Sequence, residues 1–269
     1  MPIALLPDRA VVRVSGPDRV TFLQGLVSND VAGPLPVWSA LLTPQGKWLH
    51  DFFVSTDDAS LLLETEAAQA DELVARLRKF RLRARVDFAA EPDLRVFAGW
   101  AGAPMPPGGW CDPRLEAAGW RLAAAQPIEA DADDAAYDLH RLALGLPDGS
   151  RDLDREKAIL LENGFDELRG VSWSKGCFMG QELTARTRYR GLVKKRLLPV
   201  SITGPAPPRD ALLRQDGAEA GAMRSSRGGL GLALVRLEAL GRGLPITWEQ
   251  SQLDPHVPGW MQLPQPKAA

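Results

Sequence analysis

The chain has 269 residues, of which 45% are hydrophobic and 25% are charged, and its formal net charge at pH 7 is -2. This composition is typical of a globular protein and excludes a disordered or fibrous chain, while the length predicts two or three lobes rather than one small core. The small net charge gives no overall reason to expect binding to nucleic acid or to a membrane, so either role would need a local patch.

The first residues and the cysteines lead us to expect a cytoplasmic protein. The segment MPIALLPDRAVVRV lacks the features of an export signal or a presequence. No apolar run approaches the ~18 residues of a membrane-spanning helix. Cys111 and Cys177 could form a disulfide, but without an export signal we expect two free thiols in a reducing compartment.

The first third of the chain alternates predicted strands and helices. Residues 10–14 have the pattern of a strand, and a short helix should follow it. Three strands are expected between residues 38 and 65, the last two joined by a turn at Asp57 and Asp58. Apolar spacing then predicts a helix over 66–80.

The later segments predict a mixed fold that ends in β-structure. Two strands are expected between residues 83 and 100, and the Pro- and Gly-rich stretch 103–119 should be a loop. A helix is predicted over 133–144. Residues 192–248 resemble a small barrel or sandwich, and 249–269 resemble a tail laid along the surface. The fold class is therefore α+β with an all-β C-terminal lobe.

The sequence carries few of the familiar active-site patterns. The three histidines, His50, His140 and His256, lie at no metal-ligand spacing, and there is no CxxC, HExxH or phosphate-binding loop. The segment GGLGLAL lacks the third glycine of a dinucleotide loop, so we interpret it as a strand and turn. Because an iron–sulfur cluster generally needs about four thiolate-type ligands, a cluster here would be shared with a partner.

Cys177 lies in an unusual setting, the segment KGCFMGQELTAR at 175–186. Two flanking glycines permit a tight backbone path and the close approach of another molecule. A helix over 182–189 would begin just after the thiol, and its positive end together with Lys175 would favour the thiolate, which suits metal ligation or nucleophilic attack. The alternative is a buried cysteine that fills a gap beside its apolar neighbours.

A basic run follows the cysteine. Arg186 and Arg190 are four residues apart, so they share a helix face on which an anionic ligand or an acidic partner could dock. The alternatives are a solvated surface and a contact with RNA phosphates. The run comprises Arg186, Arg188, Arg190, Lys194, Lys195 and Arg196.

Two polar residues stand out earlier in the chain. Asn29 lies at the end of a predicted helix, and Asp51 lies on a predicted strand among bulky apolar residues. Asp51 could face a central cleft or the solvent, and strand alternation alone leaves both open.

The segment KGCFMGQELTAR, continued by TRYRG, resembles the signature of the YgfZ family. These are folate-binding proteins of iron–sulfur cluster biogenesis, related to the T-protein (aminomethyltransferase) of the glycine cleavage system. SGPDRVTFLQGLVSNDV, LLTPQGKWLHDFFV and HRLALGLP resemble further family elements, in the expected order along nearly the whole chain. The segments ELTART and VKKRLLPV are most similar to the branch that includes the mitochondrial cluster-assembly members and their bacterial counterparts.

The resemblance implies a three-lobed, ring-like T-protein fold with a C-terminal β-barrel and a central pocket for tetrahydrofolate or another folate derivative. A folate-binding core domain would comprise residues 1–48 and 130–195. Residues 49–129 would form an inserted α+β domain, and residues 196–269 the barrel.

The resemblance also implies site residues and partners. Cys177 would be the key group and a shared ligand of a transient cluster, held with an A-type iron–sulfur scaffold or carrier protein. The protein would assemble or maintain [4Fe–4S] clusters and so indirectly support tRNA-modifying radical enzymes. The expected folate-binding and signature residues are Asn29, Asp51, Glu162, Lys175, Gly176, Gly180, Gln181, Glu182 and Arg186.

Two departures from the relatives bear on activity. T-proteins have an Asp-Asp pair where this chain has His50 and Asp51, and Glu162, the candidate pterin contact, follows two leucines rather than a proline. We therefore expect an assembly factor rather than an enzyme in the usual sense. A tetrahydrofolate-dependent aminomethyl or one-carbon transferase is the alternative, and an RNA-binding module is a third. We expect neither a membrane partner nor direct binding of nucleic acid.

Overall fold

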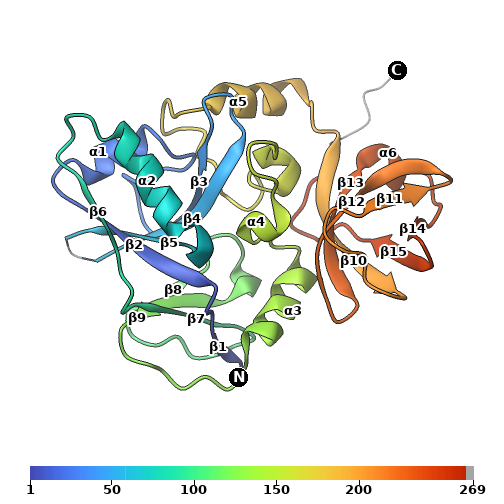
Figure 1. Ribbon diagram of the computed structural model, residues 1–269, viewed down its shortest axis with the longest axis horizontal. Coiled ribbons are helices and arrows are strands. Elements are labelled where there is room, and N and C mark those ends of the chain that lie inside the picture. Colours follow the sequence, from blue (N-terminus) through green and yellow to red (C-terminus); the bar gives the residue numbers. More distant parts are fainter. Residues whose placement is uncertain (58, 265–269) are drawn as a thin grey trace.

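The computed structural model describes residues 1–57 and 59–264. Two antiparallel sheets form one side of the molecule, and a closed β-barrel forms the other (Figure 1). The helices α3 (Asp134–Leu144) and α4 (Gly149–Asp152) lie between the sheets and the barrel (Figure 1). No helix of the described residues is long and apolar enough to cross a bilayer.

The first sheet has the strand order β3-β4-β5-β2-β6 and is the middle layer of its lobe. The first seven residues of β4 are buried without a break, because the sheet is covered on both faces. Leu73 and Leu77 of α2 (Ala70–Phe80) pack on one face, and Trp38 and Phe165 stack on the other with ring centroids 3.9 Å apart. The strands are β2 (Arg9–Ser15), β3 (Val37–Leu42), β4 (Trp48–Thr56), β5 (Leu61–Glu66) and β6 (Asp87–Ala90).

The second sheet has the order β1-β7-β9-β8. Its strand β9 was not predicted, and β8 lies within the stretch 103–119 that was expected to be a loop. Its strands are β1 (Ile3–Leu5), β7 (Arg95–Gly99), β8 (Trp110–Cys111) and β9 (Trp120–Ala124).

Short helices connect these parts. The predicted helix over 66–80 is present as η1 followed by α2, and the one over 133–144 as α3 with Asp133 as its N-cap. The remaining short elements are α1 (Arg19–Gln24), η1 (Ala67–Gln69), η2 (Glu116–Ala118) and η3 (Leu160–Asn163). The helix expected after Cys177 is α5 (Gln181–Arg190).

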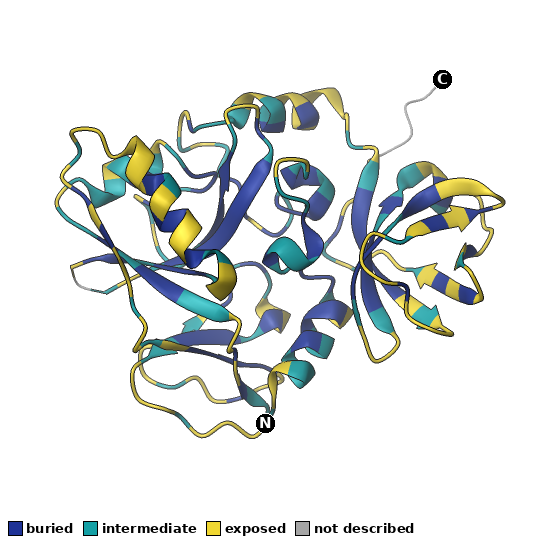
Figure 2. Ribbon diagram, in the orientation of Figure 1, coloured by how far each residue is buried: buried dark blue, intermediate teal, exposed yellow. Residues whose placement is uncertain are grey.

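The C-terminal strands form a closed barrel in the order β10-β13-β12-β11-β14-β15. Alternate side chains fill its interior, and buried and exposed residues accordingly alternate along β11 and β15 (Figure 2). The bounds are β10 (Lys195–Thr203), β11 (Leu212–Gln215), β12 (Ala218–Arg227), β13 (Leu230–Arg236), α6 (Leu237–Leu240), β14 (Ile246–Trp248) and β15 (Ser251–Pro255).

The prediction of a surface tail over 249–269 is wrong for its first part. Ser251 and Leu253 are buried, and β15 pairs with both β10 and β14, which closes the barrel. Trp260 then donates a hydrogen bond from Nε1 to the Leu144 carbonyl at 2.8 Å, which fastens the following segment to α3. Residues 265–269 of the predicted tail, and Asp58 of the predicted turn, lie outside the described residues.

The predicted domain boundaries stay a prediction. The boundary expected between residues 48 and 49 falls inside β4, which pairs with β3 and β5 in one sheet. The boundary expected at 195 and 196 falls at the start of β10.

Arg141 joins the barrel to the rest of the molecule. Its side chain is 2% exposed, and Nε donates to Asp138 on the same helix at 2.7 Å. Nη1 donates to Asp152 of α4, and Nη2 donates to the Ser225 hydroxyl of β12 at 2.9 Å. One guanidinium therefore bonds to α3, α4 and the barrel together.

We predict that Arg141→Met destabilises the fold by about 3–5 kcal/mol, because it leaves the buried carboxylate of Asp152 without its cation and removes one of the cations paired with Asp138. In a chain of this size each kcal/mol lowers the melting temperature by roughly 2–4 °C, which calorimetry would record. Arg227→Met is the matched control, since Arg227 pairs with the same Asp138 but is 41% exposed. A similar loss of stability in both variants would contradict the proposed role of Arg141 in joining the barrel to α3 and α4.

Candidate functional site

A cavity of about 290 Å³ lies where the two sheets, α3 and the barrel meet. Its lining is mostly charged, with arginines and aspartates from β2, β4, β9, α3, α4 and β12 interleaved. The charged lining residues are Asp8, Arg9, Asp51, Arg114, Arg121, Asp134, Asp138, Arg141, Asp148, Arg151 and Arg227, and the aromatic ones are Phe53 and Tyr137.

Asp51 is the sequence-predicted residue that lies in this cavity. It is buried on β4, and Trp38 donates a hydrogen bond from Nε1 to its Oδ2 at 3.0 Å. Its Oδ1 is buried and has no hydrogen-bond partner among the described residues. Burial raises the pKa of Asp51 to about 6, although the nearby Arg9 and the Trp38 hydrogen bond oppose this rise. The sequence did not decide whether this side chain faces a cleft or the solvent. In the structure it points into the cavity.

His50 lies on the opposite face of β4, because successive side chains of a strand alternate. Its Nε2 is 2.9 Å from Nη2 of Arg155, which in turn pairs with Glu72 of α2. Burial and the positive charge of Arg155 lower the pKa of His50 to about 4, so its ring is neutral at pH 7. The histidine that replaces the first aspartate of the T-protein pair is therefore not part of the cavity lining.

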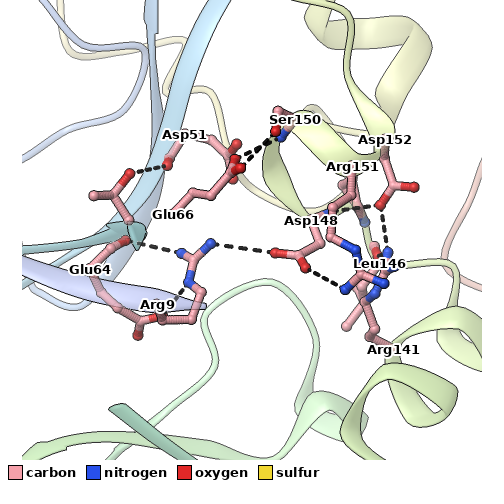
Figure 3. A network of polar contacts seen from close by, with 12 residues as sticks. Arg9, Asp51, Glu64, Glu66, Arg141, Leu146, Asp148, Ser150, Arg151 and Asp152 are labelled. Carbon is pink, nitrogen blue, oxygen red and sulfur yellow. Dashed lines mark hydrogen bonds and ion pairs between the residues drawn. The ribbon is translucent and has the colours of Figure 1, made fainter. Parts of the chain in front are cut away.

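The arginines of the cavity are held by carboxylates around it. Asp148 lies between Arg9 and the pair Arg141 and Arg151 (Figure 3). Burial alone would raise the pKa of Asp148, but Arg141 and Arg9 lower it well below its usual value. Arg121 donates two hydrogen bonds to Glu64 and one to the Tyr137 hydroxyl. The guanidinium groups are thus fixed before any ligand arrives.

Sequence reasoning did not select these arginines as site residues. Arg141 lies in the quoted element HRLALGLP, but its partners Asp152 and Ser225 are 11 and 84 residues away in the chain. A usable signal was Arg121, a charge inside the otherwise apolar stretch WRLAA, because a buried strand carries a charge only when it is paired.

The signature loop packs against the N-terminal part of the chain. Lys175 donates from Nζ to the carbonyls of Val27 and Asn29 at 2.6 and 2.7 Å. Burial lowers the pKa of Lys175 to about 8. The side-chain amide of Asn29 donates to the carbonyls of Trp38 and Arg169, so the structure brings the predicted residues Asn29 and Lys175 together. The hydrogen bonds of Asn29 and Lys175 hold the signature loop against the N-terminal part of the chain.

Gly180 and Gln181 fix the other end of the loop. Gly180 has φ +79°, and a Cβ there would lie 2.4 Å from the Thr43 carbonyl oxygen and 2.9 Å from the Cα of Gly46. Gln181 accepts a hydrogen bond on Oε1 from the Phe178 amide at 3.1 Å. Between these anchors Gly176, at φ +91°, has open space around it.

Cys177 is exposed at the tip of this anchored loop, and its thiol is free. The alternative of a buried packing cysteine is therefore wrong; Phe178 fills the core there instead. Cys111 is also exposed and free, as expected for two unpaired thiols. Within residues 1–57 and 59–264 no group of three or more His, Cys, Asp or Glu side chains could hold a metal ion.

The other predicted site residues lie outside the central cavity. Glu162 lines a separate hollow beside the barrel, with Lys157 and Lys195. Glu182 and Arg186 lie on the exposed side of α5, along a shallow surface hollow. The structure therefore separates the predicted residues into three groups: Asp51 in the cavity, the surface loop around Cys177 with α5, and Glu162 on η3 in a hollow of its own.

The sequence comparisons identify the family. A sequence model described as the CAF17 C-terminal beta-barrel domain matches residues 194–263. The human protein named iron-sulfur cluster assembly factor IBA57, mitochondrial, is 32% identical, and the alignment covers 95% of this chain and 84% of the human one. The chain belongs to the YgfZ/IBA57 family.

A fungal relative and a solved structure agree with this. The IBA57 homologue of Mycosarcoma maydis, also named a mitochondrial iron-sulfur cluster assembly factor, is 36% identical over 77% of this chain, although the match spans only 59% of that longer protein. The crystal structure of the glycine cleavage system aminomethyltransferase T from Bartonella henselae matches with a TM-score of 0.69 and 14% identity, covering 96% of this chain and 86% of that one. The expected T-protein fold is thereby confirmed.

One expectation is contradicted by the relatives. The chain was expected to be cytoplasmic, whereas the human, mouse and fungal family members are named mitochondrial proteins. The expectation rested on the first residues and on two free thiols, and free thiols are compatible with any reducing compartment.

We predict a pH-dependent effect of Asp51→Asn on stability. The pKa of about 6 in the folded chain exceeds the ordinary value of 3.8, so the folded chain holds this proton more tightly than the unfolded one. The stability contributed by the protonated Asp51 is therefore fully present below about pH 4 and is lost as the pH rises through about 6. The difference in pKa corresponds to about 3 kcal/mol at most.

Denaturant unfolding of both proteins between about pH 4 and about pH 7 would measure this. The asparagine keeps the shape and the Trp38 contact, so other titrating groups cancel in the comparison. The variant should gain stability relative to the wild type as the pH rises, and a constant difference would show that Asp51 titrates normally.

Proposed function

We propose that this chain acts in iron–sulfur cluster assembly and that Cys177 is its working group. The observation that carries the proposal is the exposed thiol of Cys177 on a loop anchored at both ends by Lys175 and Gly180. An anchored loop with an open tip holds a ligating sulfur in place while leaving room for a second molecule. The names of the human and fungal family members support the same role.

The cluster itself is the cargo, held between two proteins. Cluster ligation generally takes about four thiolate-type ligands, and Cys177 supplies one. The described residues offer no further group of ligands near it. The partner we propose is an A-type iron–sulfur carrier, which would supply the remaining thiolates. The clients would be [4Fe–4S] enzymes, among them the radical enzymes that modify tRNA.

We further propose that the central cavity binds tetrahydrofolate or a related folate. The free Oδ1 of Asp51 suits the N–H groups of a pterin ring, because a buried acceptor without a partner is costly until a donor reaches it. Arg151 and Arg227 are 37% and 41% exposed, so they retain donors for the carboxylates of a folate tail. A bound folate would present its one-carbon chemistry beside Asp51.

The alternative function, a tetrahydrofolate-dependent aminomethyl or one-carbon transferase, also has an observation in its favour. Asp51 faces the cavity, is buried and has a pKa of about 6, which suits a group that accepts and returns a proton. The substitution at His50 removes no carboxylate from the cavity, since His50 lies on the other face of β4. Turnover of a folate-bound aminomethyl group would distinguish this function from assembly alone.

Asp51→Asn should weaken tetrahydrofolate binding by at least about tenfold, the effect of losing one hydrogen bond to a charged group. Quenching of tryptophan fluorescence, or calorimetry under reducing conditions, would measure the affinity. Glu162→Ala is the control because Glu162 lines a different hollow and should leave the affinity unchanged. The reverse pattern would move the folate site away from the central cavity.

Cys177→Ala should abolish rescue of [4Fe–4S] enzyme activity, such as that of aconitase, in cells that lack this protein. Wild type and Cys111→Ala should both rescue, since Cys111 is the other exposed thiol and lies on β8. The melting temperature of Cys177→Ala should equal that of the wild type, because the side chain packs against little. Full rescue by Cys177→Ala would remove the cysteine from the mechanism.

A further inference from the structure

The helix α5, which begins just after the signature loop, presents half of its side chains to solvent. Thr184 and Thr187 lie on the buried side of the helix, and Thr187 donates from its hydroxyl to the Leu183 carbonyl of the preceding turn at 2.7 Å. The opposite side is exposed, and Tyr189 is 77% exposed, which is unusual for an aromatic side chain. Figure 2 shows this side of α5 in yellow.

A preorganised aromatic group lies beside this side of the helix. Trp173 contacts Tyr189 edge to face at 6.3 Å, and the guanidinium of Arg188 lies 4.1 Å from the centre of the Trp173 ring. Asp166 accepts a hydrogen bond from Trp173 Nε1 at 2.7 Å and lies 3.7 Å from Arg188. Side chains fixed in this way lose little entropy when a partner binds, and Trp, Tyr and Arg are the residues that most often dominate binding energy.

The same segment carries a strong local positive charge in a chain whose net charge is -2. Between residues 175 and 196 there are seven lysines and arginines, and Glu182 is the one acidic residue. Arg188, Lys195 and Arg196 are paired with carboxylates. Arg186 and Arg190 have no such partner within 4 Å in the part of the chain that the structure describes, and both border the shallow hollow along α5.

We propose that these residues form a docking face for the acidic surface of a cluster-carrying protein. The docking face comprises Trp173, Arg186, Arg188, Tyr189 and Arg190. This inference rests on the proposed function, since the face begins a few residues from Cys177 and would hold a partner within reach of the thiol. The unpaired charges of Arg186 and Arg190 are complementary to an acidic partner and would speed and orient its approach.

A protein partner fits the face better than a nucleic acid. Stacking of bases requires open ring faces. Here Arg188 covers a face of Trp173, and the two rings meet at 66° rather than in parallel. The hollow beside Arg186 and Arg190 suits carboxylate side chains that project from a folded surface.

The test is the affinity of the full chain for a purified, cluster-free A-type carrier, measured by calorimetry at about 50 mM and about 300 mM salt. Arg186→Glu/Arg190→Glu should bind at least about tenfold more weakly at the lower salt, since reversed charges repel an acidic partner. Arg83→Glu is the matched control, an exposed arginine before β6 that should leave affinity unchanged.

The outcomes separate docking from the proposed function. Equal affinity of the double variant and the wild type would overturn the docking face, whether or not Cys177 is needed for rescue in cells. Absence of carrier binding by the wild type would overturn it as well, and the rescue experiment would then decide whether a role in cluster assembly remains. Tighter binding of a single-stranded RNA 20-mer, lost in the same double variant, would assign the face to nucleic acid instead.

Discussion

The buried guanidinium of Arg141 is the constraint on which the arrangement of the lobes depends. A charge removed from water is stable only when its donors are satisfied, and Arg141 meets this need with partners from α3, α4 and the barrel. The barrel is therefore held against α3 and α4, and the central cavity lies between these elements and the sheets. Arg141 and its partner Asp138 also line the cavity. The same ion pair therefore helps to fix both the arrangement of the lobes and the shape of the site.

Two functional regions result, and they have opposite physical characters. The cavity is concave, densely charged and already ordered by its own ion pairs, which suits a small ligand with both donors and acceptors. The signature region is open and offers one thiol, a positive helix and two aromatic rings to the outside. The first can recognise a small molecule and the second a macromolecule. The folate and the protein partner that we propose would therefore be bound at different places.

Some of these features could be predicted from the sequence because they depend on residues close together in the chain. The signature, the helix after it and the strands of the barrel follow from short-range spacing and glycine positions. The direction of Asp51 and the separation of Glu162 from the cavity could not be predicted, since both depend on which distant segments pack beside them. The strand β15 was missed because its alternation of buried and exposed residues is short and lies among prolines. Pairing with the distant strand β10, which closes the barrel, is what makes it a strand. The roles of the cavity arginines depend on partners far away in the chain.

The contact between Gly180 and Gly46 has a consequence for the design of proteins that contain this signature. Each glycine fills the space in which the other would need a side chain, because a Cβ at Gly46 would lie 2.6 Å from the Gly180 carbonyl oxygen. The loop that presents Cys177 is thus half of a matched pair, and the other half is the turn between β3 and β4. A peptide with the sequence KGCFMGQELTAR, grafted onto another scaffold, would lack the surface that shapes it. A working transplant must carry the turn as well.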